Sequence, residues 1–171
     1  MGFFKDVFGG KKNFTKKELA EWKYSKKGLK EFTNLEKMHL VLAKGEICMA
    51  VFEGGLKMGN ALNVKGVVKN DLRTKIIISA FAFGVLELLA QRFEVSEEDS
   101  RSCFSHYMAE KIEKDKEFRK VQAYLQKNIF KNKTISKIMN QGLKATLDLS
   151  TNNLKNQILL HSILRDKKIK I

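Results

Sequence analysis

The apolar stretch over residues 76–90 constrains the fold of this chain more than any other feature of its sequence. It carries Ser79 and Glu87 but is otherwise apolar nearly all the way around a helix, so neighbouring protein must cover it. A membrane-spanning helix needs about 18 or more uninterrupted apolar residues, and this stretch falls short of that length. We therefore predict a buried central helix over residues 72–93, with Asp71 as its cap.

The chain of 171 residues contains no proline. Proline makes up about one residue in twenty of an ordinary protein, and its absence removes the commonest helix breaker. Capping residues predict that further helices begin near Thr15, Asn34, Ser96 and Thr134. We therefore predict an all-α protein, a single compact bundle of about six or seven helices that forms one domain over residues 13–171.

The local structure of some segments is ambiguous. Residues 47–52 form a continuous apolar run before Gly54 and Gly55, and a buried strand and a buried helix share that pattern. We predict a helix there. Residues 118–129 also have a helical pattern, which could continue the preceding helix because no breaker separates the two. We expect the last helix within residues 154–165.

Cysteine usage and the start of the chain favour a cytoplasmic protein. Cys48 and Cys103 are too few for a disulfide framework. The first residues lack the charged, apolar and small-residue regions of a secretory signal peptide. We expect a cytoplasmic location, with attachment to the inner face of the membrane as an open alternative.

Basic side chains outnumber acidic ones by 33 to 19, which gives a formal net charge of +14. The excess lies in residues 1–31, 101–133 and 134–171, whereas residues 71–100 carry three basic and six acidic side chains. The outer elements should therefore attract polyanions or anionic lipid. Only five of the basic residues are arginines, which disfavours sequence-specific reading of DNA bases. A solvated surface with a lysine-rich bias is the alternative explanation.

The sequence contains no strong signal for an enzyme. Its three histidines are scattered, and Gly-x-Ser-x-Gly, His-Glu-x-x-His and Cys-x-x-Cys motifs are absent. Cys103 and His106 lie on one helix face and could supply two metal ligands, but a site needs a third, from Cys48 or His39. We expect a non-enzymatic protein without a cofactor. A metal-binding helical protein using Cys103 and His106 is a further alternative.

The N-terminal segment, residues 1–12, points most directly to a partner. Its phenylalanines share a face of a short amphipathic helix, and lysines follow them. Such an arm docks on the protein's own core, in a groove of a protein partner or on an anionic membrane surface, where aromatic anchors need a basic second signal. We therefore predict a binding or scaffolding module. The residues predicted to bind the partner or membrane are Phe3, Phe4, Phe8, Lys11, Lys12, Lys16 and Lys17.

A nucleic-acid-associated basic helical protein is the main alternative. Acidic residues interleave with lysines as far as Glu117, and only residues 119–133 are cleanly positive. Tyr124 and Phe130 could stack on bases, although aromatic residues at helical spacing more often belong to a core. The predicted nucleic-acid contacts are Lys120, Lys127, Lys131 and Lys133.

Overall fold

The computed structural model describes residues 30, 32–62, 68–148, 158–166, 169 and 171. Within these ranges the chain forms six α-helices and no strand. The helices are α4 (Asn34–Ala61), α5 (Leu72–Arg92), α6 (Glu97–Lys114), α7 (Phe118–Asn128), α8 (Lys133–Asp148) and α10 (Leu159–Arg165). The prediction of a compact all-α bundle is confirmed.

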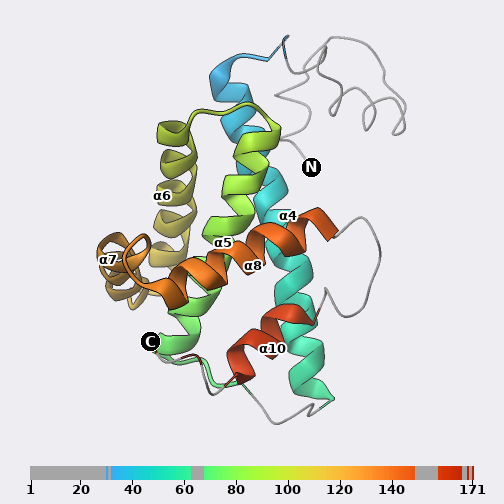
Figure 1. Cartoon of the computed structure of the whole chain (residues 1–171), viewed down its shortest axis with the longest axis vertical. Coiled ribbons are helices and arrows are strands. Elements are labelled where there is room, and N and C mark those ends of the chain that lie inside the picture. The colour runs from blue at the N-terminus through green and yellow to red at the C-terminus, as the bar shows by residue number, and fades with distance from the viewer. Residues whose placement is uncertain (1–29, 31, 63–67, 149–157, 167–168, 170) are drawn as a thin grey trace.

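Helix α5 lies at the centre of the bundle. Helices α4 and α6 run beside it, and α8 crosses it obliquely on the face toward the viewer (Figure 1). Helix α7 lies near the start of α8, and α10 packs on the C-terminal half of α4. Most residues of α5 between Thr74 and Ala90 are buried, on every side of the helix. The predicted central helix over residues 72–93 is therefore confirmed, with Phe93 as its C-cap.

Two of the predicted caps begin their helices as expected. The Asp71 carboxylate accepts a hydrogen bond from the Thr74 N–H at 2.8 Å and starts α5. The Ser96 hydroxyl accepts one from the Asp99 N–H at 3.1 Å and starts α6. Both bonds satisfy backbone donors that a helix leaves free in its first turn.

Two other predicted caps are wrong by one or two residues. Helix α4 is capped by Thr33, not Asn34, because the Thr33 hydroxyl and the Glu36 carboxylate form a reciprocal capping box. Helix α8 is capped by Asn132, not Thr134. The Asn132 Oδ1 accepts from the Thr134 N–H at 2.9 Å and from the Ile135 N–H at 3.3 Å, so it satisfies backbone donors in the first turn of α8.

The ambiguous segments have definite structures. Residues 47–52 are helical, as predicted, and lie within α4. Phe52 is fully buried there, with its ring edge-on to Phe81 at 4.9 Å. Helices α6 and α7 are separate, because Asp115 has an extended backbone and its Oδ1 accepts from the Glu117 N–H at 2.9 Å.

Glycines set the close approach of α8 to α5. A Cβ atom on Gly84 would collide with the carbonyl oxygen of Met139, and one on Gly142 would collide with that of Phe81. The two backbones are therefore in direct contact at this crossing, without side chains between them. This contact turns one face of α8 inward and leaves its opposite face outward.

Several predictions concern residues beyond those described. The arm over residues 1–12, the helix after Thr15 and the segment over residues 149–157 all lie outside the described residues. Among the helices that are described, none has the length and apolarity required of a membrane span.

Candidate nucleic-acid interface

Helix α8 has two faces of opposite character. Its inner face is apolar and buried against the bundle: Ile135, Ile138, Met139, Gly142 and Ala145. Its outer face carries Lys133, Lys137, Asn140, Gln141 and Lys144. The outer residues recur at intervals of three, four and seven, which return to one side of a helix with 3.6 residues per turn. All three lysines of this face are exposed.

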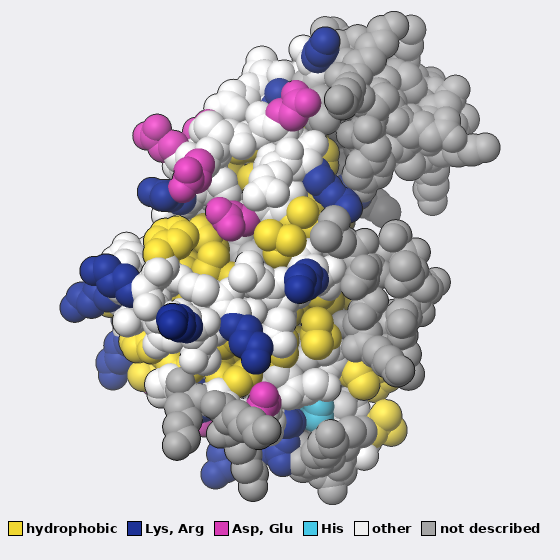
Figure 2. Space-filling view, in the orientation of Figure 1, with side chains coloured by type: hydrophobic (Ala, Val, Ile, Leu, Met, Phe, Trp, Pro, Cys, Tyr) yellow, Lys and Arg dark blue, Asp and Glu magenta, His cyan; other side chains and the backbone are white. Residues whose placement is uncertain are grey.

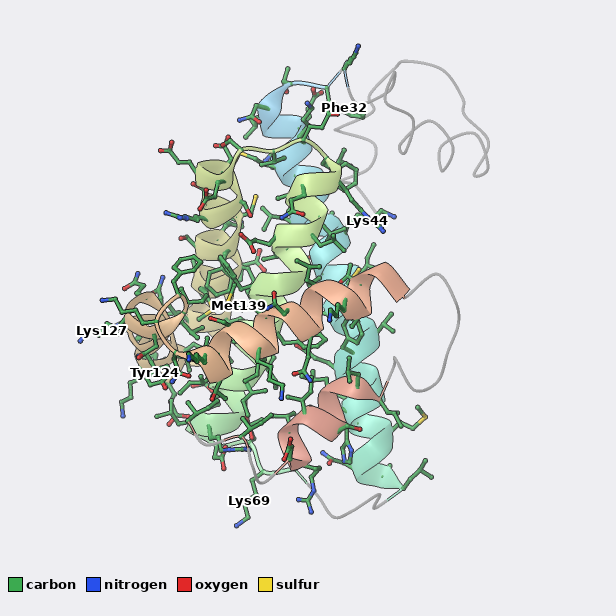
Figure 3. All side chains as sticks on the ribbon, in the orientation of Figure 1. Phe32, Lys44, Lys69, Tyr124, Lys127 and Met139 are labelled. Carbon is green, nitrogen blue, oxygen red and sulfur yellow. The ribbon has the colours of Figure 1, made fainter. Side chains whose placement is uncertain are left out.

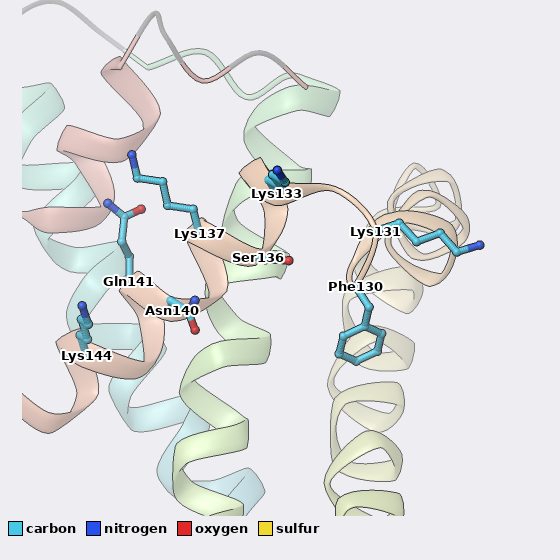
Figure 4. Close-up of a pocket in the computed structure, with 8 residues that line it drawn as sticks. All are labelled: Phe130, Lys131, Lys133, Ser136, Lys137, Asn140, Gln141 and Lys144. Carbon is cyan, nitrogen blue, oxygen red and sulfur yellow. The ribbon is translucent and has the colours of Figure 1, made fainter.

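A pocket of about 520 Å³ lies between the outer face of α8 and the turn that joins α7 to α8 (Figure 4). The turn contributes Phe130 and Lys131, and α8 contributes Ser136 together with its five outer-face residues. Phe130 is the one apolar side chain in this lining, which contains no acidic residue. A concave site with four lysines and several amide and hydroxyl groups suits an anionic ligand.

No carboxylate of the described residues balances the positive charge of the pocket. Ion pairs elsewhere occupy Lys75, Arg101 and Lys111. None of the four pocket lysines lies within 4.0 Å of a carboxylate oxygen among the described residues. Figure 2 shows basic side chains over the region of α7 and α8, and acidic side chains gathered toward the start of α6. Within the described part of the chain, the α8 face therefore carries a positive potential that no carboxylate compensates.

The start of α8 is held rigidly next to the pocket. The Asn132 cap occupies the first backbone donors, and the Ser136 hydroxyl donates to the carbonyl oxygen of Ile129 at 3.2 Å. These bonds tie the turn over residues 129–131 to the first turn of α8. The positive end of the helix dipole at this point adds to the charge of Lys133 and Lys137.

Phe130 projects from this turn with 63% of its surface exposed. Its ring packs edge-to-face with Phe83, with centroids 6.3 Å apart and planes at 78°. The guanidinium of Arg101 lies 5.5 Å from the centre of the ring. The ring is thus held in position although most of its surface is open to solvent.

Gln141 lines the pocket but also carries a buried acceptor. Its Oε1 is buried and has no hydrogen-bond partner in the part of the chain that the structure describes. Buried acceptors are normally satisfied by a donor.

The structure separates the residues predicted to contact nucleic acid into two groups. Lys131 and Lys133 line the pocket, although the Lys131 side chain points away from α8 (Figure 4). Lys120 and Lys127 are exposed on α7 but do not line it, and Lys127 points outward into solvent (Figure 3). The predicted set is therefore not a single site.

Sequence reasoning also missed five of the eight residues that line the pocket. Ser136, Lys137, Asn140, Gln141 and Lys144 were not predicted, although their spacing opposite the apolar residues of α8 is visible in the sequence. The feature that could have revealed them is the polar stripe along the predicted amphipathic helix, which extends beyond the cleanly positive residues 119–133. The net charge of a whole segment does not reveal such a stripe.

The two residues proposed as metal ligands face different environments. The Cys103 thiol is buried and lies 3.8 Å from the carbonyl oxygen of Met38, to which it donates. Burial raises the pKa of Cys103 to about 11, so the thiolate that metals require is disfavoured. His106 is largely exposed, 3.7 Å from the Glu110 carboxylate. No group of three potential His, Cys, Asp or Glu ligands converges within the described ranges.

The arm residues predicted to bind a partner or membrane, Phe3, Phe4, Phe8, Lys11, Lys12, Lys16 and Lys17, lie outside the described residues. Comparison of the chain with known protein families, curated proteins and solved structures finds no match.

Proposed function

We propose that this protein binds nucleic acid through the pocket formed by the outer face of α8 and the α7–α8 turn. The observation that supports the proposal best is the set of four lysines that line one pocket without a described carboxylate partner. Nucleic-acid affinity comes largely from such contacts, because each phosphate neutralised by a lysine releases a condensed counterion.

The spacing along α8 suits a strand of several nucleotides. Lys133 and Lys144 are separated by about 16 Å along the helix axis, from a rise of 1.5 Å per residue. That length matches the rise of about five stacked nucleotides. Lysine acts as a point charge and does not provide the planar fork with which arginine reads guanine. The pocket is therefore suited to the backbone, with little dependence on base sequence.

Binding through the N-terminal arm remains a separate prediction from the sequence. Residues 1–12 lie outside the described residues, and their predicted docking on a protein partner or on an anionic membrane uses none of the residues that line the α8 pocket. A chain with both features would have two independent contacts for anionic partners.

Salt-dependent binding of labelled oligonucleotides tests the proposal. Fluorescence anisotropy between about 0.05 and 0.2 M salt should give a linear fall of log K with log salt. Four lysine–phosphate contacts predict a slope of about −3 for a single strand. Replacing Lys131, Lys133, Lys137 and Lys144 by glutamine should abolish most of the affinity and bring the slope close to zero.

A charge-matched control separates the pocket from the net charge of the protein. Glutamine substitutions at four exposed lysines elsewhere should retain most of the affinity: Lys30, Lys57, Lys69 and Lys114. An equal loss in both quadruple variants would mean that binding follows net charge, and would contradict the proposal. The intact chain could instead bind anionic vesicles but not oligonucleotides. If the pocket variant then loses vesicle binding, the pocket is a membrane contact, and this result also contradicts the proposal.

A further inference from the structure

We infer that the pocket takes single-stranded nucleic acid, with Phe130 as the platform on which an unpaired base stacks. The inference rests on the proposed function, and it adds the class of nucleic acid. It starts from an aromatic ring that is 63% exposed in a pocket otherwise lined by polar side chains. Because burial of a phenylalanine ring is favourable, a ring left in solvent beside four lysines calls for an explanation.

The surrounding residues show that Phe130 is held outward by its local structure. The Ser136 hydroxyl ties the carbonyl oxygen of Ile129 to α8, and Asn132 caps the helix immediately afterwards. The next aromatic residue inward, Phe83, is 4% exposed and already packs edge-on against Phe104 at 4.7 Å. Phe130 packs edge-to-face with Phe83, and most of its surface stays exposed.

The ring is also prepared for a planar ligand. Contacts with Phe83 and with the Arg101 guanidinium restrict its orientation, and Arg101 is itself restrained by an ion pair with Glu97. A restrained ring loses little conformational entropy when a base stacks on it. Proteins that bind single strands without sequence preference combine a basic groove with such aromatic platforms.

The same features are less useful for duplex DNA or RNA. In a duplex the bases are already stacked on one another, and a protein that follows the backbone needs cations alone. Lys133 at the start of α8 lines the same pocket as Phe130 and can hold a phosphate next to an unstacked base, whereas the Lys131 side chain points away from α8 (Figure 4). The arrangement favours a strand whose bases are free.

Binding of a labelled single strand and of a duplex of equal length tests the inference. Phe130→Leu should lower the affinity for the single strand about 5-fold or more, the lower end of the stacking contribution per base. The salt slope should not change, because no charge is removed, and affinity for the duplex should be unchanged. Phe130→Tyr should restore single-strand binding. Leu35→Ala, at another exposed apolar residue, is the control and should change the affinity for neither the single strand nor the duplex.

A fluorescence signal reports stacking directly. The chain has one tryptophan, Trp22, so a Phe130→Trp variant in a Trp22→Phe background places a single indole in the pocket. An oligothymidine strand should quench this indole more strongly than a duplex does. The inference would be overturned if the single strand and the duplex quench the indole equally, or if Phe130→Leu lowers the affinity for both equally. Either result would leave the proposed function intact. If the intact chain binds neither probe, the proposed function itself fails.

Discussion

Gly84 of α5 lies directly against the backbone carbonyl of Met139 in α8. A Cβ atom at Gly84 would meet backbone, which cannot rotate away as a side chain can. Because this contact and its counterpart at Gly142 set the crossing of α5 and α8, they also determine which residues of α8 face the solvent.

Gly84→Ala should therefore destabilise the protein although alanine favours helix. Overpacking of a tight crossing costs about 1–3 kcal/mol, more than the gain of about 1 kcal/mol from helix propensity. Chemical denaturation should show a lower free energy of unfolding. Gly54 in α4 is the matched control, because a Cβ there meets nothing within 4 Å. Gly54→Ala should stabilise the protein by about 0.5–1 kcal/mol; a loss in both variants would contradict this account.

A buried lysine links α5 to the junction of α6 and α7. The Lys75 ammonium forms ion pairs with Asp115, at 2.7 Å, and with Glu117, and lies over the ring of Phe118 at 5.8 Å. These bonds raise the pKa of Lys75. The hydrogen bond from Lys75 is the main reason that the pKa of Asp115 is lowered from 3.8.

This network predicts a pH-dependent loss of stability in acid. The pKa of Asp115 is lower in the folded state than in the unfolded state. The ionised carboxylate therefore stabilises the fold at pH values above its unfolded-state pKa, and this stabilisation is lost as the pH falls through its folded-state pKa. The difference in Tm between the wild type and Lys75→Met should be largest near neutral pH and should shrink below about pH 4. Lys116→Met, at a neighbouring exposed lysine, should show no such pH dependence. A constant difference from pH 7 to pH 3 would contradict the ion pairs as the cause.

Arg73 connects α5 to the end of the chain. Its guanidinium donates hydrogen bonds to the carbonyl oxygens of Leu164 at 3.1 Å, Asp166 at 3.2 Å and Ile169 at 2.9 Å. Arg73→Lys keeps the charge but loses the planar set of donors. It should lower the free energy of unfolding by about 1.5–3 kcal/mol and should speed hydrogen exchange in α10. Arg92→Lys, at an exposed arginine of the same helix, is the control and should change neither.

Glu94 has a positive φ of 55° in the turn between α5 and α6. The Val95 N–H donates to the Ala90 carbonyl oxygen at 2.9 Å, which places Glu94 at the left-handed position that normally favours glycine. Glu94→Gly should raise stability by about 1 kcal/mol, measured by thermal unfolding. The same change at Glu98, in the first turn of α6, should lower stability by a similar amount. A loss at both positions would show that the Glu94 side chain has contacts that matter more than its backbone strain.

The N-terminal arm can be tested independently of the α8 pocket. If residues 1–12 anchor the protein to lipid, the intact chain should float with anionic vesicles at about 0.15 M salt, and deletion of the arm should abolish flotation. Neutral vesicles should bind neither form. Absence of binding by the intact chain would exclude the membrane and direct the search to protein partners. Persistence of binding after the deletion would assign membrane attachment to another surface.

Local sequence patterns were sufficient to predict where most of the described helices lie. The apolar residues over 76–90 have no polar face to turn toward water, so a central position followed from composition and period alone. Asp71 and Ser96 were identified as caps because a cap bonds only to residues two or three positions away. Thr33 and Asn132 were missed because several polar residues compete within one turn, and backbone geometry selects one of them.

The candidate interface depended on tertiary packing. The lysine-rich composition predicted an affinity for polyanions, since net charge is a sum over residues and needs no structure. Which lysines meet in one pocket depends on the direction in which α8 faces, and the contact of Gly84 with Met139 sets that direction. Tyr124 and Phe130 look alike in the sequence, but Tyr124 packs against the core while Phe130 is held in solvent. Contacts between residues far apart in the chain made that difference, and no local pattern encodes them.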